Sequence, residues 1–177
     1  DRVKDGYGAS KKLFQKLILK QPKLIIMVDC GSTSHAAIDY LNQQNIKSII
    51  IDHHEINLPY PRSNALINPK KNITKSENTI LCATALTYFF LDIVIKENKS
   101  DFKLSKFLIY VLLATVCDVM PLRKINKIIG IKVIKDFDLK DNAALNYLLD
   151  QNNIKRKITV EDLGFLIGPI INAGGRL

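Results

Sequence analysis

The stretch that most constrains the fold is Ile49-Ile50-Ile51-Asp52-His53-His54-Glu55. Three β-branched residues in a row indicate a buried strand. Two carboxylates and two imidazoles follow at once, and ligands of an open α/β sheet bind at the carboxyl ends of its strands. The stretch therefore predicts an α/β fold with a chemical site at this strand end. The alternative is a set of histidines that only make structural hydrogen bonds.

A second apolar run, residues 24–28, also ends in a carboxylate, that of Asp29. Between the two runs, Ala37, Ile38 and Leu41 form an apolar stripe with helical spacing. A strand, a helix and a strand with short connections require a parallel pair and a right-handed crossover. We therefore expect Asp29 and Asp52 at the same edge of the sheet.

A third acid, Asp118, follows an apolar helix expected at residues 107–113 and lies among small and apolar residues. A carboxylate in such a setting is costly to leave unpaired, so it requires a cation, a metal or several donors nearby. Capping of the following segment is the alternative role.

The stretch from Gly168 to Arg176 combines three glycines with one arginine. Glycines allow backbone N–H groups to approach an anion closely, and a guanidinium binds phosphate through two hydrogen bonds. A glycine-rich turn between domains has the same composition, so both interpretations stay open.

The remaining pattern predicts helices at residues 11–20, 79–95 and 124–150, and a short strand at residues 65–67. A capping box at residues 159–162 opens a further helix toward Gly168. The most apolar of these ranges, 79–95, is interrupted by Asp92 and falls short of the about 20 apolar residues that span a bilayer. We therefore expect a buried helix there and no membrane partner.

Charge and cysteine content limit the class of partner and the compartment. The 26 Lys and Arg residues outnumber 17 Asp and Glu residues, giving a net charge of +9, which favours a polyanion such as nucleic acid. A general bias toward Lys, Ile and Asn would produce the same excess of positive charge.

The three cysteines, Cys30, Cys82 and Cys117, form no Cys-x-x-Cys pair, so neither a disulfide framework nor a zinc ribbon is indicated. A reducing cytoplasm fits best.

Four motifs stand in an order and spacing that resembles the DHH phosphoesterase superfamily. They are Val28-Asp29-Cys30-Gly31, Ile51-Asp52-His53-His54, Ala114-Thr115-Val116-Cys117-Asp118-Val119-Met120-Pro121-Leu122 and Gly168-Pro169-Ile170-Ile171-Asn172-Ala173-Gly174-Gly175-Arg176. The last motif is most similar to the RecJ branch, the single-strand-specific 5′ to 3′ DNA exonucleases. Asp5-Gly6-Tyr7-Gly8 and Ile67-Asn68-Pro69 resemble further landmarks of that branch.

The resemblance implies a metal-dependent phosphodiesterase with two Mn²⁺ or Mg²⁺ ions, acting on single-stranded DNA in repair and recombination. It also implies a parallel sheet flanked by helices on both faces. By position, the metal ligands are Asp29, His53 and Asp118, and Asp52 is a further ligand or orients an imidazole. His54 matches the residue that faces the scissile phosphate, and the phosphate-binding stretch contributes Asn172, Gly175 and Arg176.

Two departures from the family pattern qualify this interpretation. No strand of the chain carries the family's first motif, an Asp-x-Asp-Gly type element, and Ile170 stands where a basic residue is common. We therefore expect a fragment that is inactive alone, with a partial DHH domain at residues 1–122. Residues 123–177 would be a helical connector toward a missing second domain, and a separate chain could carry the missing motif.

Two other functions remain open at this stage. One is a DHH phosphoesterase acting on short oligonucleotides or cyclic dinucleotides. The other is a non-catalytic relic or split-gene product that binds nucleic acid or a partner chain.

Overall fold

The computed structural model describes residues 4, 6, 8–71 and 77–174. The chain divides into two compact units, residues 1–87 and residues 88–177, with the division inside helix α4 (Ala83–Glu97). The family-domain boundary expected after residue 122 stays a prediction.

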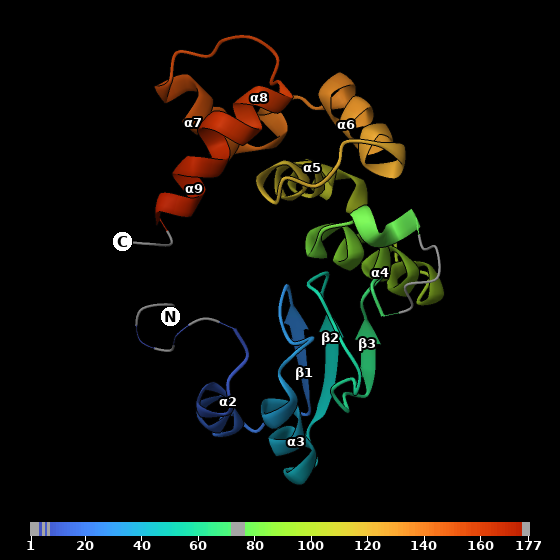
Figure 1. The fold of residues 1–177 in the computed structure, drawn as a ribbon. Helices are drawn as coiled ribbons and strands as arrows, with labels where there is room; N and C mark the ends of the chain where they lie inside the picture. The colour runs from blue at the N-terminus through green and yellow to red at the C-terminus, as the bar shows by residue number, and fades with distance from the viewer. Residues whose placement is uncertain (1–3, 5, 7, 72–76, 175–177) are drawn as a thin grey trace. The chain divides into compact units, whose positions relative to one another are not determined.

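Unit 1 contains a parallel three-stranded sheet in the order β1-β2-β3 (Figure 1). Val28 of β1 pairs with Ile51 of β2, and Ile51 pairs with Ile67 of β3. The α/β class, the parallel pair and the short third strand are confirmed. The elements of unit 1 are α2 (Lys11–Ile18), β1 (Leu24–Val28), α3 (His35–Gln43), β2 (Lys47–Ile51), β3 (Ala65–Ile67), the 3-10 helix η1 (Glu77–Ile80) and the start of α4.

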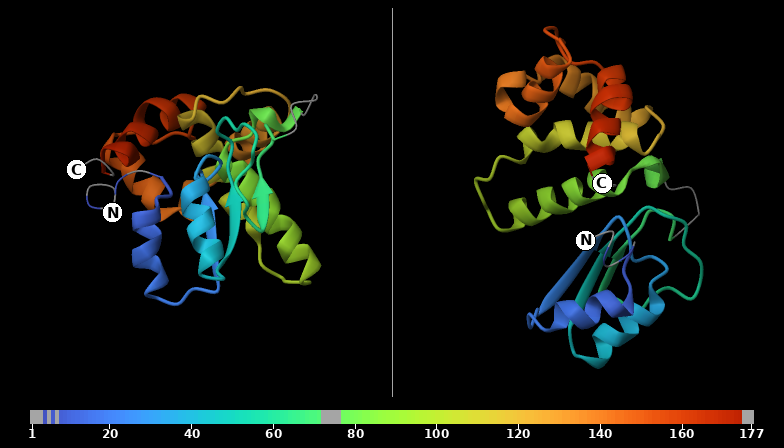
Figure 2. Two further views of the ribbon diagram at one scale, coloured as in Figure 1. Left: turned by 60° about the horizontal axis from the view of Figure 1, so that its bottom comes forward. Right: turned by 90° about the vertical axis from the view of Figure 1, so that its left-hand side faces the viewer.

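Helices α2 and α3 pack on one face of the sheet (Figure 2). Phe14 of α2 and Ile38 and Leu41 of α3 are buried with Met27 and Ile50 of the strands. Ser10 begins α2 by accepting a hydrogen bond from the Leu13 N–H. This packing fixes the crossover helix, and with it the loop that carries residues 29–34.

The opposite face of β1 is also apolar. Leu24, Ile26 and Val28 lie on it and are 43%, 49% and 42% exposed. Strands of parallel sheets are apolar on both faces, in agreement with this pattern.

Unit 2 is helical throughout its described part. Its elements are the rest of α4, the 3-10 helix η2 (Leu104–Phe107), α5 (Leu108–Cys117), α6 (Lys124–Asp136), the 3-10 helix η3 (Leu139–Asp141), α7 (Ala143–Gln151), α8 (Val160–Asp162), the π-helix η4 (Leu163–Ile167) and α9 (Gly168–Gly174).

The helical range predicted at residues 124–150 is divided into α6 and α7. Phe137 has an extended backbone and ends α6, and Asn142 begins α7 by accepting a hydrogen bond from the Leu145 N–H. The continuous apolar spacing did not reveal this break, because each helix buries apolar residues of its own, such as Val133 in α6 and Leu145 in α7.

The predicted capping box is confirmed, since the side chains of Thr159 and Asp162 each accept the other's backbone N–H. Arg156 donates to both carboxylate oxygens of Asp162, at 2.6 and 2.9 Å. The helical run continues through η4 into α9, so Gly168 to Gly174 are helical rather than an irregular loop. Within the described residues, no helix combines the length and apolarity needed to cross a bilayer.

Candidate metal centre

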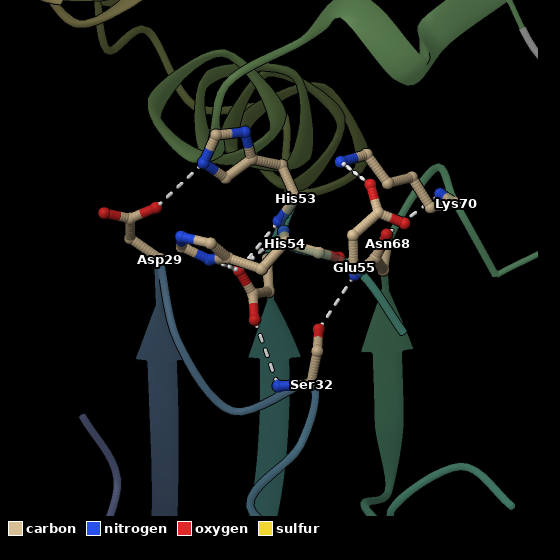
Figure 3. A network of polar contacts seen from close by, with 8 residues as sticks. Asp29, Ser32, His53, His54, Glu55, Asn68 and Lys70 are labelled. Carbon is tan, nitrogen blue, oxygen red and sulfur yellow. Dashed lines mark hydrogen bonds and ion pairs between the residues drawn. The ribbon is translucent and has the colours of Figure 1, made fainter. Parts of the chain in front are cut away.

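Polar residues follow all three strands at the same edge of the sheet (Figure 3). Asp29 follows β1, Asp52 follows β2 and Asn68 follows β3. The Asp29 N–H donates to the Ile51 carbonyl at 3.0 Å, and the Asp52 N–H donates to the Ile67 carbonyl at 2.9 Å. The strand pairing thus extends one residue into the site and holds these side chains side by side, as the sequence predicted for Asp29 and Asp52.

Asp29, His53 and His54 form a cluster that could hold a metal ion. One potential ligand atom from each lies within 4.8 Å of the others. The Nε2 atom of His53 lies 3.2 Å from Oδ1 of Asp29, and the side chain of His53 is 11% exposed against 50% for Asp29. Carboxylate and imidazole donors with one solvent-facing side fit a divalent ion such as Mn²⁺ that keeps an open position for a substrate.

Asp52 lies behind this cluster rather than within it. Its Oδ1 atom accepts the backbone N–H groups of His53 and His54 at 2.8 and 3.2 Å, and lies 2.7 Å from Nδ1 of His54. Its Oδ2 atom accepts the Ser32 N–H at 3.0 Å. Burial by itself raises the pKa of Asp52, but hydrogen bonds from His54 and Ser32 outweigh it and lower the pKa to about 2.

The ionised Asp52 carboxylate determines what His54 can do. A carboxylate can only accept this hydrogen bond, so in a neutral imidazole it holds the proton on Nδ1 and leaves the lone pair on Nε2. The geometry thus places Asp52 against the imidazole of His54, and its role at a metal site stays a prediction. It adds His54 to the potential ligand set.

Ser32 and Asn68 support the site from beneath, and neither was predicted as a site residue. The Asn68 amide donates to Ser32 Oγ at 2.8 Å and to the His54 carbonyl at 2.9 Å, and both side chains are buried. The signal that could have found Asn68 is the one that identified Asp29 and Asp52, a polar residue directly after an apolar strand. Beside them, Lys70 and Glu55 form an ion pair at 2.6 Å (Figure 3).

The turn after β1 requires unusual backbone conformations. Asp29 has a φ of 63°, in the left-handed region that Asp tolerates better than most residues. Gly31 has a φ of 114°, and a Cβ there would lie 3.2 Å from the side chain of Ile50. Cys30 lies between these two residues. Burial raises the pKa of its thiol most, and the nearby carboxylates of Asp52 and Asp29 raise it further. The atoms that cluster at the site, from Asp29, His53 and His54, are oxygen and nitrogen.

Asp118 belongs to unit 2, where it ends α5. Its N–H donates to the Ala114 carbonyl at 2.9 Å, and the Met120 N–H donates to the Thr115 carbonyl at 2.9 Å. Val119, between them, has a φ of 54°. The turn that presents Asp118 is therefore well defined, and a meeting of Asp118 with Asp29 and His53 stays a prediction.

The predicted phosphate-binding residues lie at the end of the chain. Asn172 is exposed on α9, and Gly175 and Arg176 lie outside the described residues.

Comparisons with known proteins agree with the motif pattern. The chain matches the DHH family, N-terminal domain, over residues 3–115. It is 30% identical over 192 aligned residues to the single-stranded-DNA-specific exonuclease RecJ of Dickeya dadantii and to that of Escherichia coli K12. Each alignment covers 100% of this chain but only 33% of the relative, so the chain spans about a third of the length of these relatives.

Solved structures show the same fold. A crystal structure of exonuclease RecJ bound to manganese has a TM-score of 0.83 at 22% identity, covering 99% of this chain and 44% of that one. RecJ from Thermus thermophilus in complex with Mn²⁺ has a TM-score of 0.80 at 20% identity, covering 94% of this chain and 24% of that one. On the family match, which covers more than half of its residues, the chain belongs to the DHH family.

Proposed function

We propose that this chain carries the phosphodiesterase centre of a RecJ-like, 5′ to 3′ exonuclease for single-stranded DNA. The observation that supports it best is the cluster of Asp29, His53 and His54 at the carboxyl ends of parallel strands in a DHH-family chain. The relatives named for this activity support the substrate class. A cytoplasmic role in DNA repair and recombination is part of the same proposal.

In this proposal Asp29 and His53 hold a divalent ion, Mn²⁺ or Mg²⁺, with Asp118 as a further ligand. When bound, such ions would lower the pKa of an attacking water and would stabilise both oxygens of an in-line phosphoryl displacement. Asp52 keeps His54 in the tautomer whose Nε2 is open toward a ligand or the scissile phosphate.

The rest of the proposal concerns how DNA is held. The net charge of +9 attracts the phosphate backbone, and Asn172, Gly175 and Arg176 would contact phosphate groups. No strand in the chain carries an Asp-x-Asp-Gly element, so we expect a second ion to be weakly held. A separate polypeptide carrying such a strand is the partner chain that this proposal calls for.

The test is Mn²⁺-dependent release of nucleotides from 5′-labelled single-stranded DNA. We expect negligible release by the chain alone, and release when a polypeptide carrying the missing strand is added. Asp118→Ala should abolish the restored activity. Rapid digestion by the chain alone that is lost in Asp118→Ala would show that residues 1–177 already hold a complete site.

A length series of substrates separates this function from its alternatives. A RecJ-like exonuclease should degrade strands of many nucleotides, whereas an oligonucleotide or cyclic dinucleotide phosphoesterase should prefer the shortest substrates. Binding of DNA without cleavage under every condition would favour the non-catalytic alternative.

A further inference from the structure

Two glycines of the helical run 163–174 lie against the last turn of α5. A Cβ added at Gly164 would lie 3.0 Å from Cγ1 of Val116. A Cβ at Gly168 would lie 2.6 Å from Sγ of Cys117, a separation that real Cβ atoms essentially never show. Gly168 is also buried, and its added Cβ would lie 3.0 Å from the Leu163 carbonyl oxygen, so Sγ of Cys117 must move and the backbone around Gly168 must shift by a few tenths of an ångström.

Gly164 lies within the π-helix η4, Gly168 follows directly after it, and η4 contacts α5. Pro169 follows η4 after Gly168, and its ring clashes in an α-helix with the carbonyl four residues earlier and donates no N–H. The wider π turn relieves this clash and lets the chain continue as α9. The two glycines thus bring η4 and the first residue of α9 closer to the end of α5 than side chains would allow.

The residue that Gly168 touches is the one directly before Asp118. Cys117 is the last residue of α5 and Asp118 is its C-cap. A displacement of Cys117 would therefore move the Asp118 carboxylate with it. On the other side of the contact, Asn172 lies one helical turn beyond Gly168 on the same side of α9.

We propose that Gly168 is a positioning residue that fixes the turn presenting Asp118 and sets its distance from Asn172. The roles of Asp118 as a metal ligand and Asn172 as a phosphate contact rest on the proposed function. The packing of Gly168 against Cys117 rests on the geometry of unit 2 alone. Gly168 thereby couples the metal-binding motif of α5 to the phosphate-binding motif of α9.

The test is a double-mutant cycle on the full 177-residue chain. Gly168→Ala is expected to reduce the hydrogen-exchange protection of the Met120 amide and the Mn²⁺ affinity by about tenfold each. Cys117→Ala removes the Sγ atom that the new methyl group meets, so Gly168→Ala/Cys117→Ala should recover most of both losses. Cys117→Ala alone should match the wild type.

Gly130→Ala is the matched control, because a Cβ at Gly130 of α6 would make only an ordinary contact, 3.5 Å from Cδ1 of Leu112. It should leave both measurements unchanged. Wild-type values for Gly168→Ala, or an equal loss in the double variant, would overturn the proposal. If Gly168→Ala does not fold, a folded double variant would support the proposal and an unfolded double variant would overturn it.

Hydrogen exchange and Mn²⁺ binding test two separate claims, so one claim can fail while the other holds. Amide protection of Met120 reports the packing without any metal. A wild-type chain that binds no Mn²⁺ would count against the proposed function, and the exchange data would still decide whether Gly168 positions the Asp118 turn.

Discussion

Nδ1 of His54 lies 2.7 Å from Oδ1 of Asp52, a residue that is only 1% exposed. The same oxygen accepts two backbone N–H groups, and the other oxygen accepts the Ser32 N–H. A buried carboxylate is stable only when it is satisfied in this way. The strand end therefore orients His54 through contacts that belong to the protein itself.

Replacing Asp52 with Asn should destabilise the protein. An amide group cannot accept all four hydrogen bonds, so at least one buried N–H loses its partner, which costs about 1–3 kcal/mol. Asp29→Asn is the matched control, because its side chain is 50% exposed and Asn also tolerates a positive φ. Urea unfolding should show a clear loss for Asp52→Asn and a change of about 0.5 kcal/mol or less for the control. Equal losses in the two variants would mean that the hydrogen bonds of Asp52 add no stability beyond that of an exposed carboxylate.

The difference between wild type and Asp52→Asn should depend on pH. Despite burial, hydrogen bonds lower the pKa of Asp52 from 3.8 to about 2 in the folded protein. Its stabilising effect is therefore complete above about pH 4 and is lost as the pH falls toward 2. The difference should be about 1 kcal/mol smaller at pH 3 than at pH 5. The Arg156 guanidinium lowers the pKa of Asp162, but Asp162 titrates in both proteins, so its contribution cancels in the stability difference between them. A constant difference would contradict this account.

The sequence predicted the convergence of the strand ends in unit 1 well because its signals are local. An apolar run that ends in Asp29 or Asp52 indicates a strand end, and the parallel crossover brings the two ends together. The role of Asp52 could not be predicted in the same way. Whether a carboxylate binds a metal or accepts backbone N–H groups depends on the path of the chain at Ser32, 20 residues away.

Unit 2 was harder to predict because its signals are ambiguous. The apolar spacing of α6 and α7 runs on through the break at Phe137. The glycines at 164 and 168 are typical of loops, but in the structure they serve close packing inside a helical run. Their partners, Val116 and Cys117, are about 50 residues away, and a single sequence carries no signal for such contacts.

Replacing Val119 with Gly should stabilise the protein. Val119 has a φ of 54° and is 87% exposed, so its left-handed backbone conformation costs free energy that no burial of the side chain offsets. Gly is preferred at this position after a helix, and the expected gain is about 1 kcal/mol. Ile128→Gly, at a 62% exposed position inside α6, should instead lose about 1 kcal/mol. Thermal unfolding that shows a loss for both variants would contradict the proposed strain at Val119.

Binding to single-stranded DNA should be weak, independent of sequence and sensitive to salt. The net charge of +9 supplies cations for phosphate contacts, whereas only 7% of residues are aromatic, so stacking with bases contributes little. Affinity measured by fluorescence anisotropy should fall about tenfold or more between about 50 and 200 mM salt, equally for oligo-dT and mixed sequences. An affinity that stays flat would show that the charge is only a compositional bias.

The central claim, that the strand-end cluster binds a divalent ion, is tested most directly by titrating the chain with Mn²⁺ and following free Mn²⁺ by electron paramagnetic resonance. His53→Ala should lower the affinity by about tenfold or more, because it removes the least exposed donor of the cluster. His35→Ala, an exposed histidine of α3 outside the cluster, should bind as the wild type does. Equal Mn²⁺ affinity for the wild type, His35→Ala and His53→Ala would contradict the account.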